Sequence, residues 1–312
     1  MNYIGIDLGG TNIKGAVVNE AGGILREASR PTQVEKGPEA IADGIAAVIR
    51  ELSGDGELGG VGLGCPGTVD DESGEVVCAF NLNLIHYDLR GAIRSRTGCE
   101  IRLGNDANVA ALAEATVGVG KGAHSTVVIT LGTGVGCGVV IEGRMLVGYT
   151  GAASELGHMV IAEDGAPCTC GRRGCFEAYA SATALIRMTR EAMAENPNSA
   201  MHAVAQENGA VDGRTAFQAK ARGDAAAAEV VRRYVKYLAA GVTNVVNIFF
   251  PEVVAFSGGV ANQGEELLTP LREEVARQEF GGAYVKRHAR LVPCTLGYQA
   301  GVIGAALLAK QG

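Results

Sequence analysis

Four side chains that could hold a transition metal lie within the short glycine-rich stretch 158–181. They are His158, Cys168, Cys170 and Cys175. One imidazole and three thiolates are a donor set that suits tetrahedral Zn²⁺. The Cys-x-Cys spacing is tighter than that of the usual zinc knuckle, so free or redox-active thiols stay open as alternatives from spacing alone. A closed shell of four protein ligands leaves no position for water or substrate, so such a site would position His158 instead of acting as a Lewis acid.

Two glycine-rich turns could hold phosphate groups. DLGGTNIK, at Asp7–Lys14, follows an apolar segment, and LGTGVGCG, at Leu131–Gly138, repeats its pattern. Backbone N–H groups can converge on an anion in such turns because glycine has no Cβ. The Thr11 hydroxyl adds a donor, and Asp7 is placed to hold Mg²⁺ directly or through water. A tight β-hairpin is the alternative for either turn alone. Neither turn is a Walker loop or a dinucleotide fingerprint, because no Gly-Lys-Ser/Thr follows and the next element is a strand.

A carboxylate stands at the end of a predicted strand, in the sequence GNDAN. Asn105 and Asp106 close that strand and open a helix. Asp106 could act as a general base that takes a proton from an attacking hydroxyl group. Capping of the following helix is the alternative role for this carboxylate.

Composition and charge disfavour several classes of protein. The chain has 312 residues, of which 47% are hydrophobic and 20% charged, as is typical of a packed globular protein of two domains. A formal net charge of −7 offers no basic stripe for nucleic acid. The N-terminal residues lack a signal-peptide pattern and the apolar runs are too short to cross a bilayer. We therefore expect a soluble cytoplasmic protein with reduced cysteines.

The apolar pattern predicts alternating strands and helices. Strands are expected in the segments 2–9, 13–19, 22–32, 59–67, 99–106, 125–146 (two strands) and 252–260. Helices are expected in 38–52, 88–98, 107–118, 181–195, 225–249, 265–278 and 298–310. In the first of these helices the apolar residues recur on one face, at Ile41, Ile45, Val48, Ile49 and Leu52.

The segment that begins at Ser125 repeats the opening of the chain, with a strand, a Gly/Thr turn and a second strand. This repetition predicts two related α/β domains, each opening on a β-hairpin. We place the boundary near Lys121. The N-terminal domain then comprises residues 1–120, joined by a C-terminal helix at 297–312, and the larger domain comprises residues 121–296 with the cysteine loop.

The segments DLGGTNIK, LGTGVGCG, GNDAN, ELGH and CTCGRRGC together resemble the motifs of the ROK (repressor, open reading frame, kinase) family of sugar kinases and sugar-responsive repressors. The resemblance covers essentially the whole chain, and the Cys-x-Cys-Gly-x-x-Gly-Cys motif is matched in full. It implies a two-domain α/β fold of the actin-like, ribonuclease H-like ATPase type, with nucleotide and sugar in the cleft between the domains. It also implies a homodimer or a dimer of dimers, which interacts with neither nucleic acid nor membrane.

The resemblance further implies roles for individual residues. Asp106 matches the catalytic base. The positions that match sugar-binding residues are Gly67, Asn81, Asn105, Asp106, Glu155, His158 and Glu177. The positions that match the site for ATP and Mg²⁺ are Asp7, Gly9, Gly10, Thr11, Asn12, Lys14, Gly132, Thr133, Gly134, Gly136, Gly258 and Gly259. The positions that match Zn²⁺ ligands are His158, Cys168, Cys170 and Cys175. Without the motifs around them, Glu155 would be a solvated surface acid and Glu177 a favourable charge at a helix N-terminus.

The function implied is that of an ATP-dependent hexose kinase that phosphorylates the 6-hydroxyl of glucose. One feature departs from the family pattern, because glucokinases usually carry Gly-Trp where this chain has Asn83-Leu84, and the chain contains no Trp. N-Acetylglucosamine, N-acetylmannosamine and mannose are therefore alternative substrates. A sugar-responsive repressor is a weaker alternative, because Asp7 follows Met1 too closely for a preceding DNA-reading helix. A non-catalytic sugar sensor is weaker still, because Asp106 and both phosphate loops are present.

Overall fold

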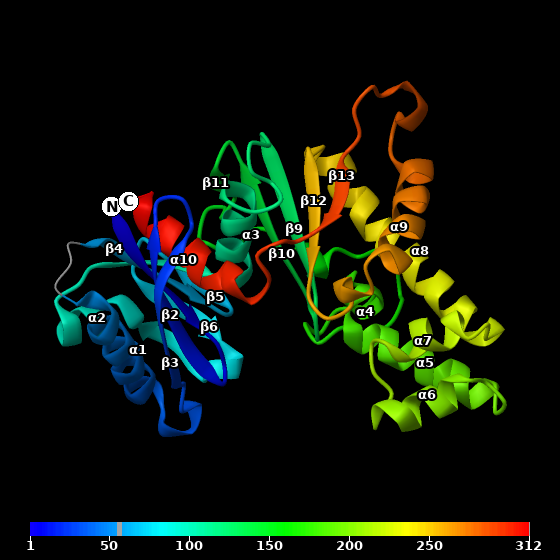
Figure 1. The fold of residues 1–312 in the computed structure, drawn as a ribbon, viewed down its shortest axis with the longest axis horizontal. Coiled ribbons are helices and arrows are strands. Elements are labelled where there is room, and N and C mark those ends of the chain that lie inside the picture. Colours follow the sequence, from blue (N-terminus) through cyan, green and yellow to red (C-terminus); the bar gives the residue numbers. More distant parts are fainter. Residues whose placement is uncertain (55–57, 312) are drawn as a thin grey trace. The chain divides into compact units, whose positions relative to one another are not determined.

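The computed structural model describes residues 1–54 and 58–311, which form two compact units (Figure 1). Unit 1 consists of Met1–Val128, Gly138–Ser154 and Cys294–Gly312, and unit 2 consists of Ile129–Cys137 and Glu155–Pro293. A single boundary near Lys121 does not describe this division, because residues 121–128 and 138–154 belong to unit 1.

A five-stranded sheet forms the centre of unit 1, in the order β3-β2-β1-β4-β8. Its strands are β1 (Asn2–Leu8), β2 (Asn12–Asn19), β3 (Ile24–Pro31), β4 (Leu58–Cys65) and β8 (Ile101–Asn105). Strand β1 runs antiparallel to β2 and parallel to β4. The helices of this unit are α1 (Pro38–Ser53), α2 (Leu89–Thr97), α3 (Asp106–Thr116) and α10 (Ala300–Lys310). These elements confirm the strands and helices that the apolar pattern predicts here.

Different helices cover the two faces of this sheet. Helix α1 buries all five apolar side chains of its predicted face. On the opposite face, glycines let α10 pack directly on the strand backbone. A Cβ at Gly5 would lie 1.8 Å from the carbonyl oxygen of Val302, and one at Gly62 would lie 1.9 Å from that of Ala305. Figure 1 shows the red helix α10 beside β1 and β4, although these strands lie near the other end of the chain.

A small antiparallel sheet in unit 1 was not expected from the sequence. It consists of β5 (Thr68–Asp70), β6 (Glu75–Ala79) and β7 (Leu84–Asp88). Asp71 fastens this sheet to the edge strand β8. Its carboxylate accepts hydrogen bonds from Arg90 Nη2 at 2.5 Å, from Arg102 Nε at 2.6 Å and from the Leu103 N–H at 2.7 Å. Asp71 thereby satisfies an edge N–H that is otherwise free to pair with another chain.

Replacing Asp71 with Ala is expected to destabilise unit 1 by about 2 kcal/mol, because it leaves the partly buried Arg90 without its charged partner. The measurement is the midpoint of urea unfolding, followed by circular dichroism. Glu51→Ala is the matched control, because Glu51 pairs with Arg30 where both side chains are about half exposed. The control should stay within about 0.5 kcal/mol of wild type. Equal midpoints for the two variants would contradict the role of Asp71.

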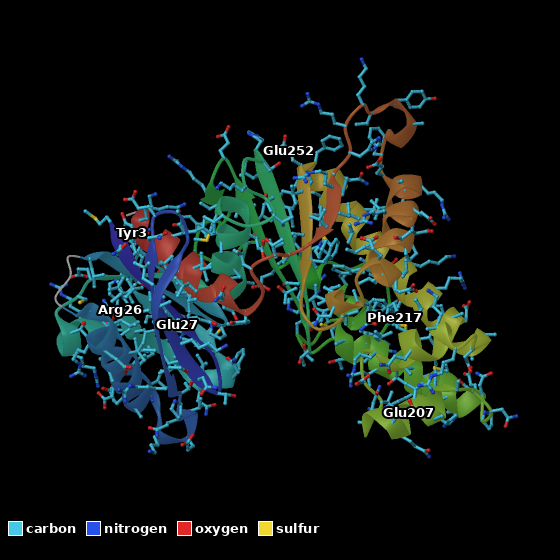
Figure 2. The ribbon with its side chains drawn as sticks, viewed as in Figure 1. Tyr3, Arg26, Glu27, Glu207, Phe217 and Glu252 are labelled. Atoms are coloured by element: carbon cyan, nitrogen blue, oxygen red, sulfur yellow. The ribbon has the colours of Figure 1, made fainter. Side chains whose placement is uncertain are left out.

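The second five-stranded sheet has the order β11-β10-β9-β12-β13. Its strands are β9 (Ser125–Leu131), β10 (Val135–Ile141), β11 (Arg144–Met145), β12 (Val253–Ser257) and β13 (Arg290–Pro293). The helices of unit 2 are α4 (Glu177–Ala180), α5 (Ala182–Glu195), α6 (Met201–Asn208), α7 (Thr215–Ala221), α8 (Ala225–Phe249) and α9 (Glu265–Gln278). Phe217 on α7 is buried, whereas Glu207 on α6 is exposed and pairs with Arg222 (Figure 2). Over residues 1–54 and 58–311, no helix combines the length and the apolar character that a membrane span needs.

Candidate active site

The first glycine turn of unit 1 is held in shape by a buried threonine. The Gly9 N–H donates to the Asn12 carbonyl at 3.0 Å, which closes the turn between β1 and β2. The Thr32 hydroxyl donates to the Gly9 carbonyl at 2.6 Å, and the Thr32 N–H donates to the Thr11 carbonyl at 2.9 Å. Gly10, Thr11 and Asn12 are exposed. The turn therefore offers its tip to a ligand while Thr32, which sequence analysis did not single out, fixes its base.

Asp7 lies at the end of β1, opposite Lys14 in the β1–β2 register. Burial raises the pKa of Asp7 above its ordinary value, the Lys14 ammonium opposes that shift, and the nearby Asp106 carboxylate adds to it. A Cβ at Gly301, in the first turn of α10, would lie 2.8–3.2 Å from all three carboxyl atoms of Asp7. The carboxylate therefore rests against the N-terminal end of a helix, which is a favourable place for a negative charge.

Asn105, and not Asp106, is the capping residue of the helix that follows. Asn105 caps α3, because its Oδ1 accepts from the Asn108 N–H at 3.1 Å. Its Nδ2 donates to the Gly67 carbonyl at 2.9 Å, and the Asn105 amide also donates to the Asp106 carboxylate, which opposes the rise in the pKa of Asp106. Asp106 is the first residue of the helix. Burial raises the pKa of Asp106, while hydrogen bonds from backbone N–H groups, including that of Ala107, oppose the shift. A carboxylate with a raised pKa is a stronger base than an ordinary aspartate.

The small sheet of unit 1 brings two further predicted residues to this region. Gly67 has φ of +84°, and a Cβ there would lie 2.0 Å from the Cys78 carbonyl oxygen, so a larger residue does not fit. Asn81 lies beside the first glycine turn, because its Nδ2 is 3.8 Å from the place that a Cβ on Gly10 would occupy. Unit 1 thus gathers the predicted Asp7, Asn81 and Asp106 with the turn.

The second glycine turn, in unit 2, is held by neighbours on α4 and α5. The Val135 N–H donates to Glu177 Oε2 at 3.0 Å. The Ala182 N–H donates to the Gly132 carbonyl at 2.8 Å, and the Thr183 hydroxyl donates to the Thr133 carbonyl at 2.8 Å. These bonds fix the loop from both sides.

The other predicted residues of unit 2 differ in their surroundings. Gly258 has φ of +88°, and a Cβ there would lie 2.5–2.8 Å from the backbone of Leu131, so it packs directly on the second turn. Gly259 has open space on its Cβ side. Gly136 lies within β10 and is half-buried, and Glu155 is exposed.

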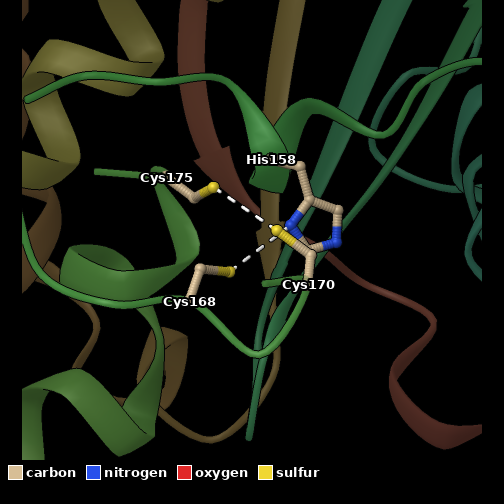
Figure 3. A group of neighbouring side chains, drawn as sticks. All are labelled: His158, Cys168, Cys170 and Cys175. Atoms are coloured by element: carbon tan, nitrogen blue, oxygen red, sulfur yellow. Dashed lines mark hydrogen bonds between the residues drawn. The ribbon is translucent and has the colours of Figure 1, made fainter. Parts of the chain in front are cut away.

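His158, Cys168, Cys170 and Cys175 come together as the sequence predicts, with their ligand atoms within 4.8 Å of one another (Figure 3). The Cys170 and Cys175 sulfurs are 3.7 Å apart, and Cys168 Sγ lies 3.6 Å from His158 Nδ1. In a tetrahedral site, Zn–S bonds of about 2.3 Å and Zn–N bonds of about 2.0 Å give S–S edges of about 3.8 Å and S–N edges of about 3.5 Å. The donor set and these two separations therefore fit Zn²⁺.

The electrostatics of the cluster also suit a cation. The pKa of the exposed Cys170 is lowered, chiefly by a hydrogen bond from the Arg172 backbone. Burial raises the pKa of the Cys175 thiol to about 12, which disfavours the thiolate. A bound cation would reverse this effect, because it stabilises the thiolate. Gly174 has φ of +78°, and a Cβ there would lie 1.7 Å from the Ala162 carbonyl oxygen, so only glycine fits this turn. Because His158 turns Nδ1 to the sulfurs, Nε2 is left as a potential N–H donor.

Two α/β units, each with a glycine turn between its opening strands, define the class as an actin-like ATPase fold, and this expectation is confirmed. The family model for the ROK family matches residues 3–312, and the chain belongs to that family.

Individual relatives agree with this family assignment. A glucokinase from Thermotoga maritima is 39% identical over 315 aligned positions, which cover 100% of this chain and 98% of the relative. The crystal structure of a ROK family glucokinase from Streptomyces griseus, in complex with glucose and AMPPNP, is 35% identical with a TM-score of 0.82, and the match covers both chains fully. That of a ROK hexokinase from Thermus thermophilus is 33% identical with a TM-score of 0.81, covering 100% of this chain and 98% of the other.

Proposed function

We propose that this chain is a glucokinase that transfers the γ-phosphoryl group of ATP to the 6-hydroxyl of glucose. The observation that carries the proposal is the end-to-end similarity to glucokinases, including one solved with glucose and AMPPNP. The half-buried carboxylate of Asp106 lies close enough to Asp7, just before the exposed glycine turn, to raise the pKa of Asp7. A phosphoryl transfer needs such a proton acceptor near a phosphate site.

Within this proposal, Asp106 accepts the proton of the sugar hydroxyl as its oxygen attacks phosphorus. Asn105, whose amide bonds both the Gly67 carbonyl and the Asp106 carboxylate, is a proposed contact of a neighbouring sugar hydroxyl. Asn81 and Gly67 border the same region of unit 1. His158, Glu155 and Glu177 of unit 2 are further proposed contacts of sugar hydroxyls. Asp7 would hold Mg²⁺ directly or through water, and the ion would neutralise charge on the phosphates. The twelve matched residues of the two turns and of Gly258-Gly259 are the proposed nucleotide contacts.

His158, Cys168, Cys170 and Cys175 are the proposed Zn²⁺ ligands. When bound, Zn²⁺ would supply structural order to the loop, since four protein ligands leave no open coordination position. His158 would then be neutral, with its Nε2–H directed away from the sulfurs toward a sugar. A homodimer or dimer of dimers and a cytoplasmic location stay predictions of the sequence.

A kinase for N-acetylglucosamine, N-acetylmannosamine or mannose is the second candidate function. Leu84 stands where family glucokinases usually have Trp, and its side chain is fully buried in the core of unit 1. The chain contains no Trp that could supply this ring, which leaves the sugar preference to other residues.

An ATP-coupled assay over a panel of sugars tests the proposed function. We expect the highest kcat/KM with glucose, and little activity without Mg²⁺. A higher kcat/KM with an N-acetylated amino sugar would favour the second candidate. Sugar binding with no turnover of any sugar would favour the repressor or sensor alternatives.

A further inference from the structure

Glu177 joins two loops of unit 2 that have separate roles in the proposed function. Its Oε2 accepts the Val135 N–H of the second glycine turn at 3.0 Å. Its Oε1 accepts the hydroxyl of Thr169, in the cysteine loop, at 3.0 Å. Glu177 itself begins α4, immediately after the Cys175-Phe176 pair. One carboxylate therefore bridges the residues proposed to hold zinc and the turn proposed to hold nucleotide phosphate.

Close backbone packing at two glycines makes this bridge stiff. A Cβ at Gly134 would lie 2.3 Å from Glu177 Oε2, so the carboxylate rests directly on the turn. A Cβ at Gly157 would lie 2.2 Å from the Val135 carbonyl oxygen. Gly157 directly precedes His158, so the His158 side of the cluster also contacts Val135. The segments on either side of the cluster, at Gly157 and at Glu177, therefore both pack against residues 134–135 of the turn. A displacement of the cysteine loop would therefore move Val135.

The metal would control the Thr169 end of the bridge. Thr169 lies between Cys168 and Cys170, so ligation of both sulfurs fixes its backbone and its hydroxyl. Cys168 Sγ also lies 3.6 Å from Glu177 Oε1, but that contact depends on a thiol proton, which a metal-bound sulfur has lost. In the metal-bound protein the hydrogen bond from the Thr169 hydroxyl is thus the side-chain link between the cysteine loop and Glu177.

We propose that Glu177 couples the cysteine cluster to the nucleotide, so that Zn²⁺ at one site tightens the binding of ATP at the other. Glu177 acts here as a positioning residue for the second glycine turn. The coupling rests on the proposed function, because it assumes that zinc binds at the cysteine cluster and that a nucleotide phosphate binds at the second glycine turn. Thermodynamic linkage makes it reciprocal, so nucleotide also tightens the binding of zinc.

The test is calorimetric titration of AMPPNP into protein without sugar, in zinc-loaded and metal-free forms. The chelator is removed by dialysis and Mg²⁺ is restored before titration, so that Zn²⁺ is the variable. The test variant is Thr169→Val, which removes the hydroxyl and keeps all four proposed ligands; Glu177→Ala removes the whole bridge. Thr183→Val is the matched control, because it deletes the hydrogen bond to the Thr133 carbonyl, a bond to the same turn that does not involve the cysteine loop.

For wild type we expect the Kd of AMPPNP to rise about fivefold when zinc is removed, which is the low end of measured couplings. In Thr169→Val and Glu177→Ala the ratio of the metal-free Kd to the zinc-loaded Kd should fall below about twofold. In Thr183→Val both Kd values should rise, and their ratio should stay at the wild-type value. A full wild-type ratio in Thr169→Val, or a ratio near one in wild type, would overturn the coupling.

A second readout serves if the metal-free protein unfolds, as judged by circular dichroism. Zinc-loaded Thr169→Val, with its metal content verified, should then bind AMPPNP more weakly than zinc-loaded wild type, and equal affinities would overturn the coupling. Failure of the proposed function looks different, because wild type would then bind no zinc or no AMPPNP. If wild type binds both zinc and AMPPNP, and neither ligand changes the affinity for the other, the coupling is refuted and the proposed function is not.

Discussion

Asp106→Asn is expected to lower kcat for glucose phosphorylation by about 10²–10⁴-fold, the usual contribution of a general base. An amide cannot accept the proton of the sugar hydroxyl, but its oxygen can still take the hydrogen bond that Asp106 Oδ1 receives from the Ala107 N–H at 2.8 Å. The fold and the binding of glucose should therefore survive. Initial rates give kcat, and calorimetry gives the Kd of glucose.

Asp43→Asn is the matched control for this substitution, because Asp43 is an exposed acid on α1 that pairs with Arg96. It should retain wild-type kcat. A pH profile supplies an independent readout. Burial raises the pKa of Asp106, so the acid limb of wild-type kcat/KM should fall above the ordinary aspartate pKa of about 3.9. Asp106→Asn with more than half of the wild-type kcat would remove Asp106 from the mechanism.

Cys170→Ser is expected to raise the KM for glucose by about 10–100-fold and to lower the thermal midpoint, because it weakens metal binding at the cluster. Cys170 is the exposed member of the cluster, so the change disturbs packing least. Zinc content is measured by atomic absorption, KM by initial rates and the midpoint by calorimetry. All three should change together.

Cys99→Ser is the control for the loss of a thiol, because Cys99 is half-buried in unit 1 and its Sγ contacts the Thr97 carbonyl at 3.8 Å. It should keep wild-type metal content and KM. Purified wild-type protein that holds no transition metal yet phosphorylates glucose at full rate would refute the zinc site.

Elements with a strong local signal could be predicted from the sequence. The apolar spacing in residues 38–52 specifies one face of a helix, and α1 buries all five side chains of that face. Gly98 adopts the left-handed conformation that closes α2, as its position after the predicted helix indicates. The cysteine cluster was also predictable, because its four donors lie close together in the sequence.

Contacts between distant residues gave no such signal. Thr32 fixes the first glycine turn from 23 residues away, and Thr183 fixes the second from 50 residues away, with no periodicity to mark either. The strands β5, β6 and β7 are short, and residues 80–83 between β6 and β7 show no pattern that would identify a hairpin. Glu177, predicted as a sugar contact, also bonds Val135 and Thr169, and no local pattern in the sequence marks these two bonds.

The packing of helix α10 on strands β1 and β4 affects how the protein folds during synthesis. Strands β1 and β4 leave the ribosome early, but the glycine-lined face that they form is covered by α10, which is synthesised more than 200 residues after β4. At about 5–20 residues per second, that apolar surface waits on the order of ten seconds or more for its cover. Unit 1 therefore cannot mature during translation in the order of its sequence. A chaperone that shields the nascent sheet, or a slower translation rate, should change the yield of active protein more than its stability.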